Sequence, residues 1–227
     1  MLMNILITRT KRKKTISILI KDGNVEVKAP FNLKQNEIDA FILKKEKWIK
    51  NKILLQKKIK QLPKKKFFNG EIFKFLGKDL ILKINISDAK KTYIKNDYIC
   101  LDLKNNTKNN RDKIKKELEL FYRSFSEKIL KEKTLIESKK MNLKVEKIKV
   151  RSYKNRWGSC SSNGDISYNW KLIMAPEKII NYVIIHELCH LIHFNHSRDY
   201  WKEVSKKLPN YRESKEWLKS NQYLFDW

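Results

Sequence analysis

Alternation of apolar and polar residues predicts β-strands in three parts of the chain. In residues 4–30, the pattern runs through Ile16–Ile20, stops at the turn signal Asp22–Asn24, and resumes at Val25–Val27. A second group of alternating segments covers residues 72–101. The third begins near Val145 and continues after the Asn163-Gly164 turn signal as one strand from Ile166 to Leu172. The chain is therefore expected to hold several short, turn-connected strands.

Helical spacing of apolar residues fills the segments between these strands. It predicts long amphipathic helices at 34–60 and 111–138, and two short helices near 200–208 and 212–218. Another helix is expected to open at Pro176-Glu177 and run to about residue 193, because proline and an acidic residue suit the first helical turn. Pro63 is expected to end the first long helix.

The order of these elements predicts an α+β protein in two parts. Residues 1–105 form a β-rich N-terminal domain with one long helix, and residues 106–227 form a second α+β domain. The polar segment Asn105–Asn110 reads as the loop between them.

Histidine is the residue type whose distribution carries most information. All 4 histidines of the 227-residue chain lie between positions 186 and 196. His186 and His190 are four residues apart, which places them one above the other on a helix face, about 6 Å apart. Both imidazoles can then reach one Zn²⁺. Glu187 lies one residue off that line, where it can act as a general base on water without binding the metal.

A catalytic zinc site needs a third protein ligand and an open position. The candidates for the third ligand are His193, His196, Asp199 and Glu203. His193 would be strained on a continuing helix, because its Cα would lie about 10.5 Å from that of His186. His196 is favoured, with Glu203 next, provided that the chain turns back near Asn195.

The spacing of His186, His190 and His196 equals that of the metzincin pattern, but His193 stands where that pattern has glycine. No methionine follows Met174, so the methionine turn beneath the metal is absent and the chain is no metzincin. In zincin-like folds an edge strand lines the cleft and can pair with an extended peptide, and the segment Arg156–Cys160 is the candidate for that strand here.

Three residues of the strands beside this cleft are predicted to bind substrate. They are Arg156, Ser159 and Asn169, with Arg156 placed to stabilise an oxyanion or to hold a phosphate.

The run from Arg156 to Trp201 resembles the YgjP-type metal-dependent hydrolases, zincin-like bacterial proteins related to the SprT and WLM groups. The resemblance extends to the N-terminal hairpin and the helix around Trp48. It implies a zincin-like metallopeptidase domain over residues 106–227 with an HExxH active-site helix, Zn²⁺ on the three histidines, and Glu187 as the catalytic acid/base. One member of that family is also described as a UTP pyrophosphatase.

Three functions remain open. The first is a zinc peptidase in which Glu187 activates metal-bound water, and the second is a nucleotide (UTP) pyrophosphatase at the same metal. The third is a nucleic-acid-associated protein with a structural metal site, which the net charge of +27 would favour. Mn, Co or Ni could replace zinc in vitro. The expected partners are a peptide or nucleotide substrate, with nonspecific polyanion binding as a further possibility.

Composition and the N-terminal sequence indicate a folded protein outside the membrane. Hydrophobic residues make up 41% of the chain, which excludes wholesale disorder, and no run of 18 apolar residues is present that could span a membrane. The basic cluster Lys11–Lys14 follows the first apolar run, the reverse of a secretory signal, so a cytoplasmic location without membrane attachment is expected.

Overall fold

The structure is a computed structural model that describes residues 4–61, 64–104 and 110–225. Pro63 and most of the predicted loop at Asn105–Asn110 lie outside the described residues. The chain divides into two compact units, Met1–Lys64 and Lys65–Trp227. Within the described part, no helix is long and apolar enough to cross a membrane.

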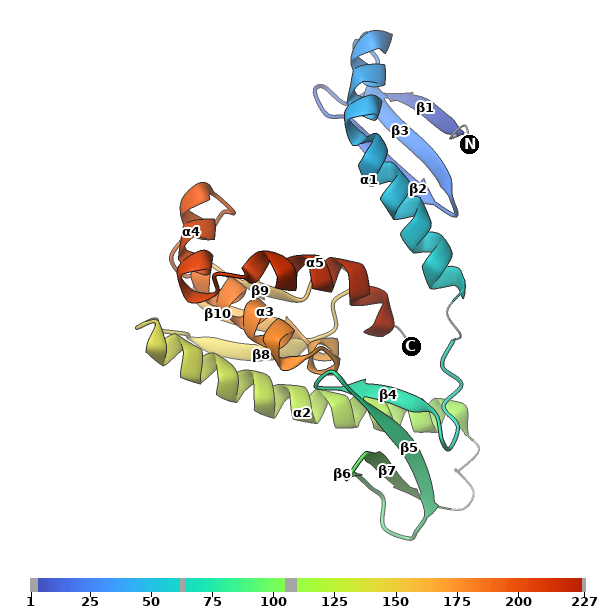
Figure 1. Ribbon diagram of the computed structural model, residues 1–227, viewed down its shortest axis with the longest axis vertical. Coiled ribbons are helices and arrows are strands. Elements are labelled where there is room, and N and C mark those ends of the chain that lie inside the picture. The colour runs from blue at the N-terminus through green and yellow to red at the C-terminus, as the bar shows by residue number, and fades with distance from the viewer. Residues whose placement is uncertain (1–3, 62–63, 105–109, 226–227) are drawn as a thin grey trace. The chain divides into compact units, whose positions relative to one another are not determined.

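The first unit is a three-stranded sheet with one long helix, α1 (Gln35–Gln61). The strands are β1 (Ile5–Thr10), β2 (Ser17–Lys21) and β3 (Asn24–Pro30), in the order β1-β3-β2. β2 and β3 form the predicted hairpin, with Asp22 and Gly23 both at positive φ in its turn. Val25, Val27 and Ala29 of β3 and Ile38 and Ile49 of α1 form its core. Figure 1 shows α1 lying along this sheet.

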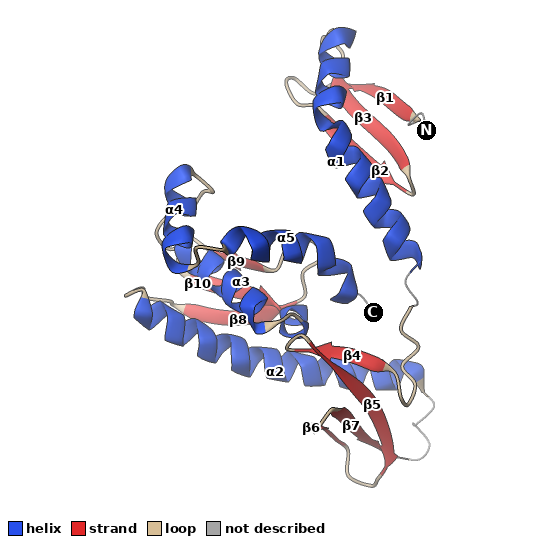
Figure 2. Ribbon diagram, viewed as in Figure 1, coloured by secondary structure: helices blue, strands red, loops and turns tan. Residues whose placement is uncertain are grey.

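The second unit begins with a four-stranded sheet of order β4-β5-β7-β6. Its strands are β4 (Ile72–Phe75), β5 (Lys78–Ile86), β6 (Lys91–Lys95) and β7 (Tyr98–Leu103). The long helix α2 (Arg111–Lys140) follows and contacts β6 of this sheet and β8 of the next one (Figures 1 and 2). The predicted helix at 111–138 is therefore present, with Asn110 as its N-cap.

A second sheet, three α-helices and two short 3-10 helices complete the described part of this unit and carry the candidate site. The sheet has the order β8-β10-β9, formed by β8 (Lys147–Arg151), β9 (Gly158–Cys160) and β10 (Asp165–Asn169). A short 3-10 helix η2 (Trp170–Met174) leads into α3 (Glu177–Cys189), and α4 (Arg198–Lys207), α5 (Tyr211–Asn221) and η3 (Gln222–Phe225) end the chain. Figure 2 shows the mixture of strands and helices, which confirms the predicted α+β class.

The division of the chain differs from the predicted boundary at residue 105. Strands β4 to β7 belong to the same core as α2 and α3, because apolar side chains such as Phe73 and Leu101 are buried in one cluster with Leu118 and Ile180. The β4–β5 turn is also tied to η2 by a hydrogen bond from the Gly77 amide to the Met174 carbonyl. The polar loop after β7 is therefore a connection inside the second unit.

Two predicted element ends near the site were wrong. The strand expected to reach Leu172 ends at Asn169, because the Asn169 side chain accepts a hydrogen bond from the Lys171 amide and starts η2. The helix expected to reach residue 193 ends at Cys189. There the amides of His190 and Leu191 bond to carbonyls only three residues back, so the last turn tightens and the helix stops.

Candidate metal centre and active site

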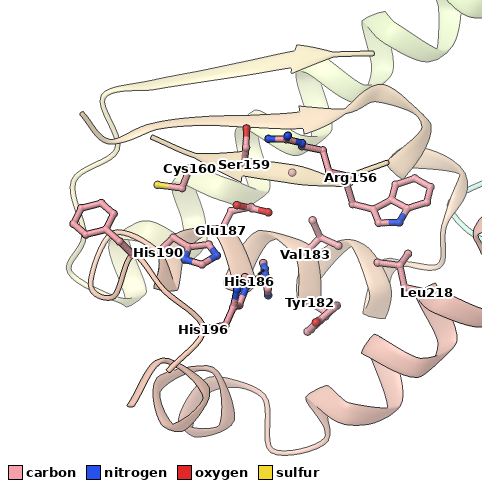
Figure 3. Close-up of a pocket in the computed structure, with 13 residues that line it drawn as sticks. Arg156, Ser159, Cys160, Tyr182, Val183, His186, Glu187, His190, His196 and Leu218 are labelled. Carbon is pink, nitrogen blue, oxygen red and sulfur yellow. Dashed lines mark hydrogen bonds between the residues drawn. The ribbon is translucent and has the colours of Figure 1, made fainter. Parts of the chain in front are cut away.

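Helix α3 holds the first part of the site because most of its surface is anchored in the core. Ile180, Ile184 and Leu188 are fully buried, and their spacing fixes the rotation of the helix. That rotation turns His186 and Glu187 toward a pocket between α3 and β9 (Figure 3).

The structure brings His186, His190 and His196 together. One ring nitrogen from each lies within 4.8 Å of the others, and the Nε2 atoms of His186 and His196 are 3.2 Å apart. Ring centroids are separated by 4.7–5.1 Å. The predicted convergence of these three imidazoles is therefore present in the geometry (Figure 3).

His196 reaches the group because the chain turns back after α3. The early end of α3 releases residues 190–197 into a short return, and Ser197 then caps α4 by accepting from the Tyr200 amide. The chain turns back near Asn195, as the choice of His196 required, without a positive φ at Asn195. The return depends on the tight last turn of α3.

The donor set fits a divalent cation such as Zn²⁺. His190 Nδ1 lies 3.1 Å from the His193 carbonyl, so it carries the proton and its Nε2 keeps a free lone pair. His186 Nδ1 is buried without a hydrogen-bond partner among the described residues. Burial, with smaller contributions from His190 and His196, lowers the pKa of His186 to about 3. Neutral imidazole is the form that binds metals.

Glu187 lies between α3 and the β9 strand and is only 4% exposed. Burial raises its pKa to about 8, against an opposing effect of Arg156. A Cβ atom added to Gly158 would lie 2.5 Å from Glu187 Oε1 and 2.7 Å from its Cγ. The carboxylate of Glu187 therefore occupies space that exists only because residue 158 is glycine.

The pocket beside these groups has a volume of about 440 Å³ and is bounded by two kinds of wall. One wall is helical and carries His186, Glu187 and His190, with His196 beside it. The other is formed by the segment Arg156–Cys160, which includes β9. Trp157, Val183 and Leu218 are among its apolar lining residues.

Arg156 and Ser159, both predicted to bind substrate, line this pocket. The Arg156 guanidinium lies over the Tyr153 ring at 5.5 Å and makes no hydrogen bond or ion pair with another described residue. The Ser159 hydroxyl lies 3.0 Å from that of Tyr153.

Asn169 does not line the pocket. It is 4% exposed, and its amide donates to the carbonyls of Tyr153 and Arg156. The side chain therefore holds the segment before β9 in place. Its polar character suggested an open strand face, but its hydrogen bonds are all internal.

The alternative third ligands lie apart from the three-histidine group. Glu203 bonds to Lys206 at 2.6 Å, and this hydrogen bond lowers its pKa. His193 contributes its main-chain carbonyl to His190, and neither His193 nor Asp199 belongs to the group.

Two contributions to the site were missed in the sequence. Gly158 was treated only as part of a strand, although a glycine facing a catalytic helix is a signal of close approach. Tyr200 and Trp201 were not among the predicted site residues, yet their rings contact the histidines directly.

Comparison with known proteins identifies the family of this chain. No curated protein matches the chain. Among solved structures, the chain is similar to the metallopeptidase zymogen of Pyrococcus abyssi abylysin, with 22% identity and a TM-score of 0.38 over 41% of this chain and 95% of that chain. The model of the YgjP-like metallopeptidase domain matches residues 14–221, as the resemblance predicted. The chain therefore belongs to the YgjP-like metallopeptidase domain family and is a metal-dependent hydrolase.

Proposed function

We propose that the protein is a zinc-dependent peptidase in which Glu187 moves the protons of the reaction. The observation that carries this proposal is the convergence of three imidazoles beside a buried carboxylate in one pocket. His186, His190 and His196 would hold the cation, and three histidine ligands are a known set for catalytic zinc. When bound, zinc supplies a Lewis acid that polarises a carbonyl and lowers the pKa of water to about 7.

Glu187 would accept a proton from the attacking water and return it to the departing amine. The position of its carboxylate in the pocket beside the histidines supports this role (Figure 3). It is not one of the three grouped ligands, so its carboxylate is available for proton transfer. The lack of a Cβ at Gly158 lets this carboxylate sit between α3 and β9, where bulk water is largely excluded.

Strand β9 would hold the peptide. In the sheet order β8-β10-β9, one edge of β9 pairs with β10, and β9 is the edge strand on the pocket side among the described strands. An extended peptide can add to such an edge through main-chain hydrogen bonds. Arg156, whose guanidinium has no ionic partner in the described residues, would then stabilise negative charge on the substrate.

Glu187→Gln tests this proposal. The variant is expected to bind one equivalent of zinc with wild-type affinity and to cleave an unfolded protein about 10²–10⁴-fold more slowly. Glu203→Gln is the matched control, because Glu203 bonds to Lys206 away from the three histidines, and it should retain activity. Full activity of Glu187→Gln, or no zinc binding by the wild-type chain, would refute the proposal.

Hydrolysis of a nucleotide at the same metal is the second candidate. It is favoured by the Arg156 guanidinium, which lines the pocket and has no ion pair with another described residue. Arginine binds phosphate well through paired N–H groups. The two candidates separate when wild-type, metal-free and Glu187→Gln proteins are assayed for pyrophosphate release from UTP and for cleavage of an unfolded protein. The activity that requires both the metal and Glu187 identifies the substrate class.

A further inference from the structure

The ring of Tyr200 packs against all three histidines of the candidate metal centre. Its centroid lies 4.6 Å from that of His190, in a stacked arrangement, and 4.8 Å and 5.4 Å from those of His196 and His186, which it meets edge-on. Tyr200 is fully buried in the first turn of α4, where the Ser197 hydroxyl fixes its main-chain amide. One rigid ring therefore touches side chains from both ends of the return that follows α3.

The Tyr200 hydroxyl contacts the main chain of α3 and not the histidine rings. It donates to the main-chain oxygen of His186 at 2.9 Å. His186 lies in the last turn of α3, where main-chain carbonyls lack helical partners. This bond ties α4 to α3, but it does not touch an imidazole ring.

Trp201 supports His196 from another side. The Trp201 and His196 rings are stacked, with centroids 5.6 Å apart and planes 24° apart. Trp201 is itself stacked on Tyr211 at 5.1 Å, and the Lys215 ammonium lies 4.1 Å from its centroid. This support is needed because His196 lies on an exposed loop, where its ring would otherwise rotate freely.

We propose that Tyr200 is a positioning residue for the metal centre, that its ring rather than its hydroxyl sets metal affinity, and that Trp201 does the same for His196. A ligand ring that is already held in its binding orientation loses little entropy when the cation binds. Contacts with all three rings make Tyr200 the side chain best placed to supply this order. This proposal rests on the metal site of the proposed function. Tyr200 and Trp201 would supply the packing against the ligands that a methionine turn supplies in metzincins.

The test measures metal binding instead of turnover. Zinc affinity is obtained by competition with a chromophoric chelator, and the visible absorption of the Co²⁺-loaded protein reports ligand geometry. Tyr200→Leu is expected to weaken zinc binding about 10–100-fold and to shift the cobalt bands, as loss of a supporting group does. Tyr200→Phe keeps the ring and should stay within about threefold of the wild type.

Tyr122 provides the matched control. It is also fully buried in the second unit, and its hydroxyl also donates to a main-chain carbonyl, that of Lys74. Its ring neighbours include Phe75, Phe121 and Trp170. Tyr122→Leu should lower thermal stability while leaving zinc affinity and the cobalt spectrum unchanged. Equal weakening in Tyr122→Leu and Tyr200→Leu would mean general destabilisation and overturn the inference.

Trp201→Leu keeps the inference testable if Tyr200→Leu does not fold, because Trp201 is only partly buried. It is expected to weaken zinc binding about tenfold. Wild-type affinity in this variant and in any folded Tyr200→Leu protein overturns the inference while leaving the proposed function intact. Failure of the wild-type chain to bind zinc would overturn both the proposed function and the positioning role of Tyr200 and Trp201.

Discussion

The two walls of the pocket are built differently. The helix wall, made of His186 and Glu187 on α3 and His190 directly after it, is anchored in the larger of the two cores among the described residues, and Glu187 is 4% exposed. The strand wall, residues Arg156–Cys160, contains a three-residue strand and is only partly buried, with Arg156 exposed. Atoms of the helix wall are thus fixed by packing, whereas the strand wall is more exposed. Under the proposed function, the helix wall would carry the chemistry and the strand wall would bind the substrate.

Removing a ligand from the helix wall should have the largest effect. His190→Ala is expected to weaken zinc binding by more than about 10³-fold, beyond the roughly 10–100-fold typical of changes outside the ligand set. Hydrolytic activity should fall with it. Equilibrium dialysis and activity at fixed zinc measure both quantities.

His193→Ala is the control for that loss. Its main-chain carbonyl, not its side chain, contacts His190, so alanine keeps the contact. If His193→Ala weakens zinc binding as much as His190→Ala does, the helix wall cannot be distinguished from its surroundings as the source of the metal ligands.

Gly158→Ala tests the point where the two walls touch. A Cβ at this position would lie 2.5 Å from Glu187 Oε1, so the carboxylate must move. We expect kcat to fall about 10²-fold, since misplacement by about 1 Å can cost that much, while zinc affinity stays near wild type.

A double-mutant cycle isolates the cause. If the alanine acts through Glu187, then adding Gly158→Ala to Glu187→Gln should lower kcat little further. If the double variant instead shows the product of the two single losses in kcat, then Gly158→Ala acts on the strand wall and not through Glu187.

The helix wall was the more predictable of the two from sequence. Positions of His186, Glu187 and His190 relative to one another follow from the helical period alone. The return of His196 depended on where α3 ends, and the sequence placed that end too late because the tightening at His190 and Leu191 leaves no residue signature.

The strand wall could be predicted only in part, because its geometry depends on distant contacts. The fit of Glu187 against Gly158 joins α3 to β9 across 29 positions of sequence. Asn169 continued a polar alternation and so suggested an open face, but the carbonyl of Tyr153 lies within its reach after folding. Likewise, the loop near residue 105 looked like a domain boundary because packing of β4–β7 against α2 is not local.

Arg156→Gln should separate binding from chemistry. Its guanidinium lines the pocket without an ionic partner among the described residues. Removing it should therefore weaken substrate binding rather than disturb an internal ion pair. We expect KM to rise about tenfold with kcat nearly unchanged if the group binds ground state and transition state alike. Lys154→Gln, an exposed change just before the strand wall, is the control and should change neither constant. A loss confined to kcat would instead make Arg156 part of the reaction chemistry.

Ser159→Ala should have the smallest effect, although Ser159 lies in the middle of β9 and lines the pocket. Its hydroxyl already pairs with that of Tyr153, and peptide binding at a strand edge depends on main-chain groups that alanine retains. Steady-state kinetics on an unfolded protein substrate should show kcat and KM within about threefold of wild type. A large drop in kcat would place reaction chemistry on the strand wall, and the division of labour between the walls would have to be abandoned.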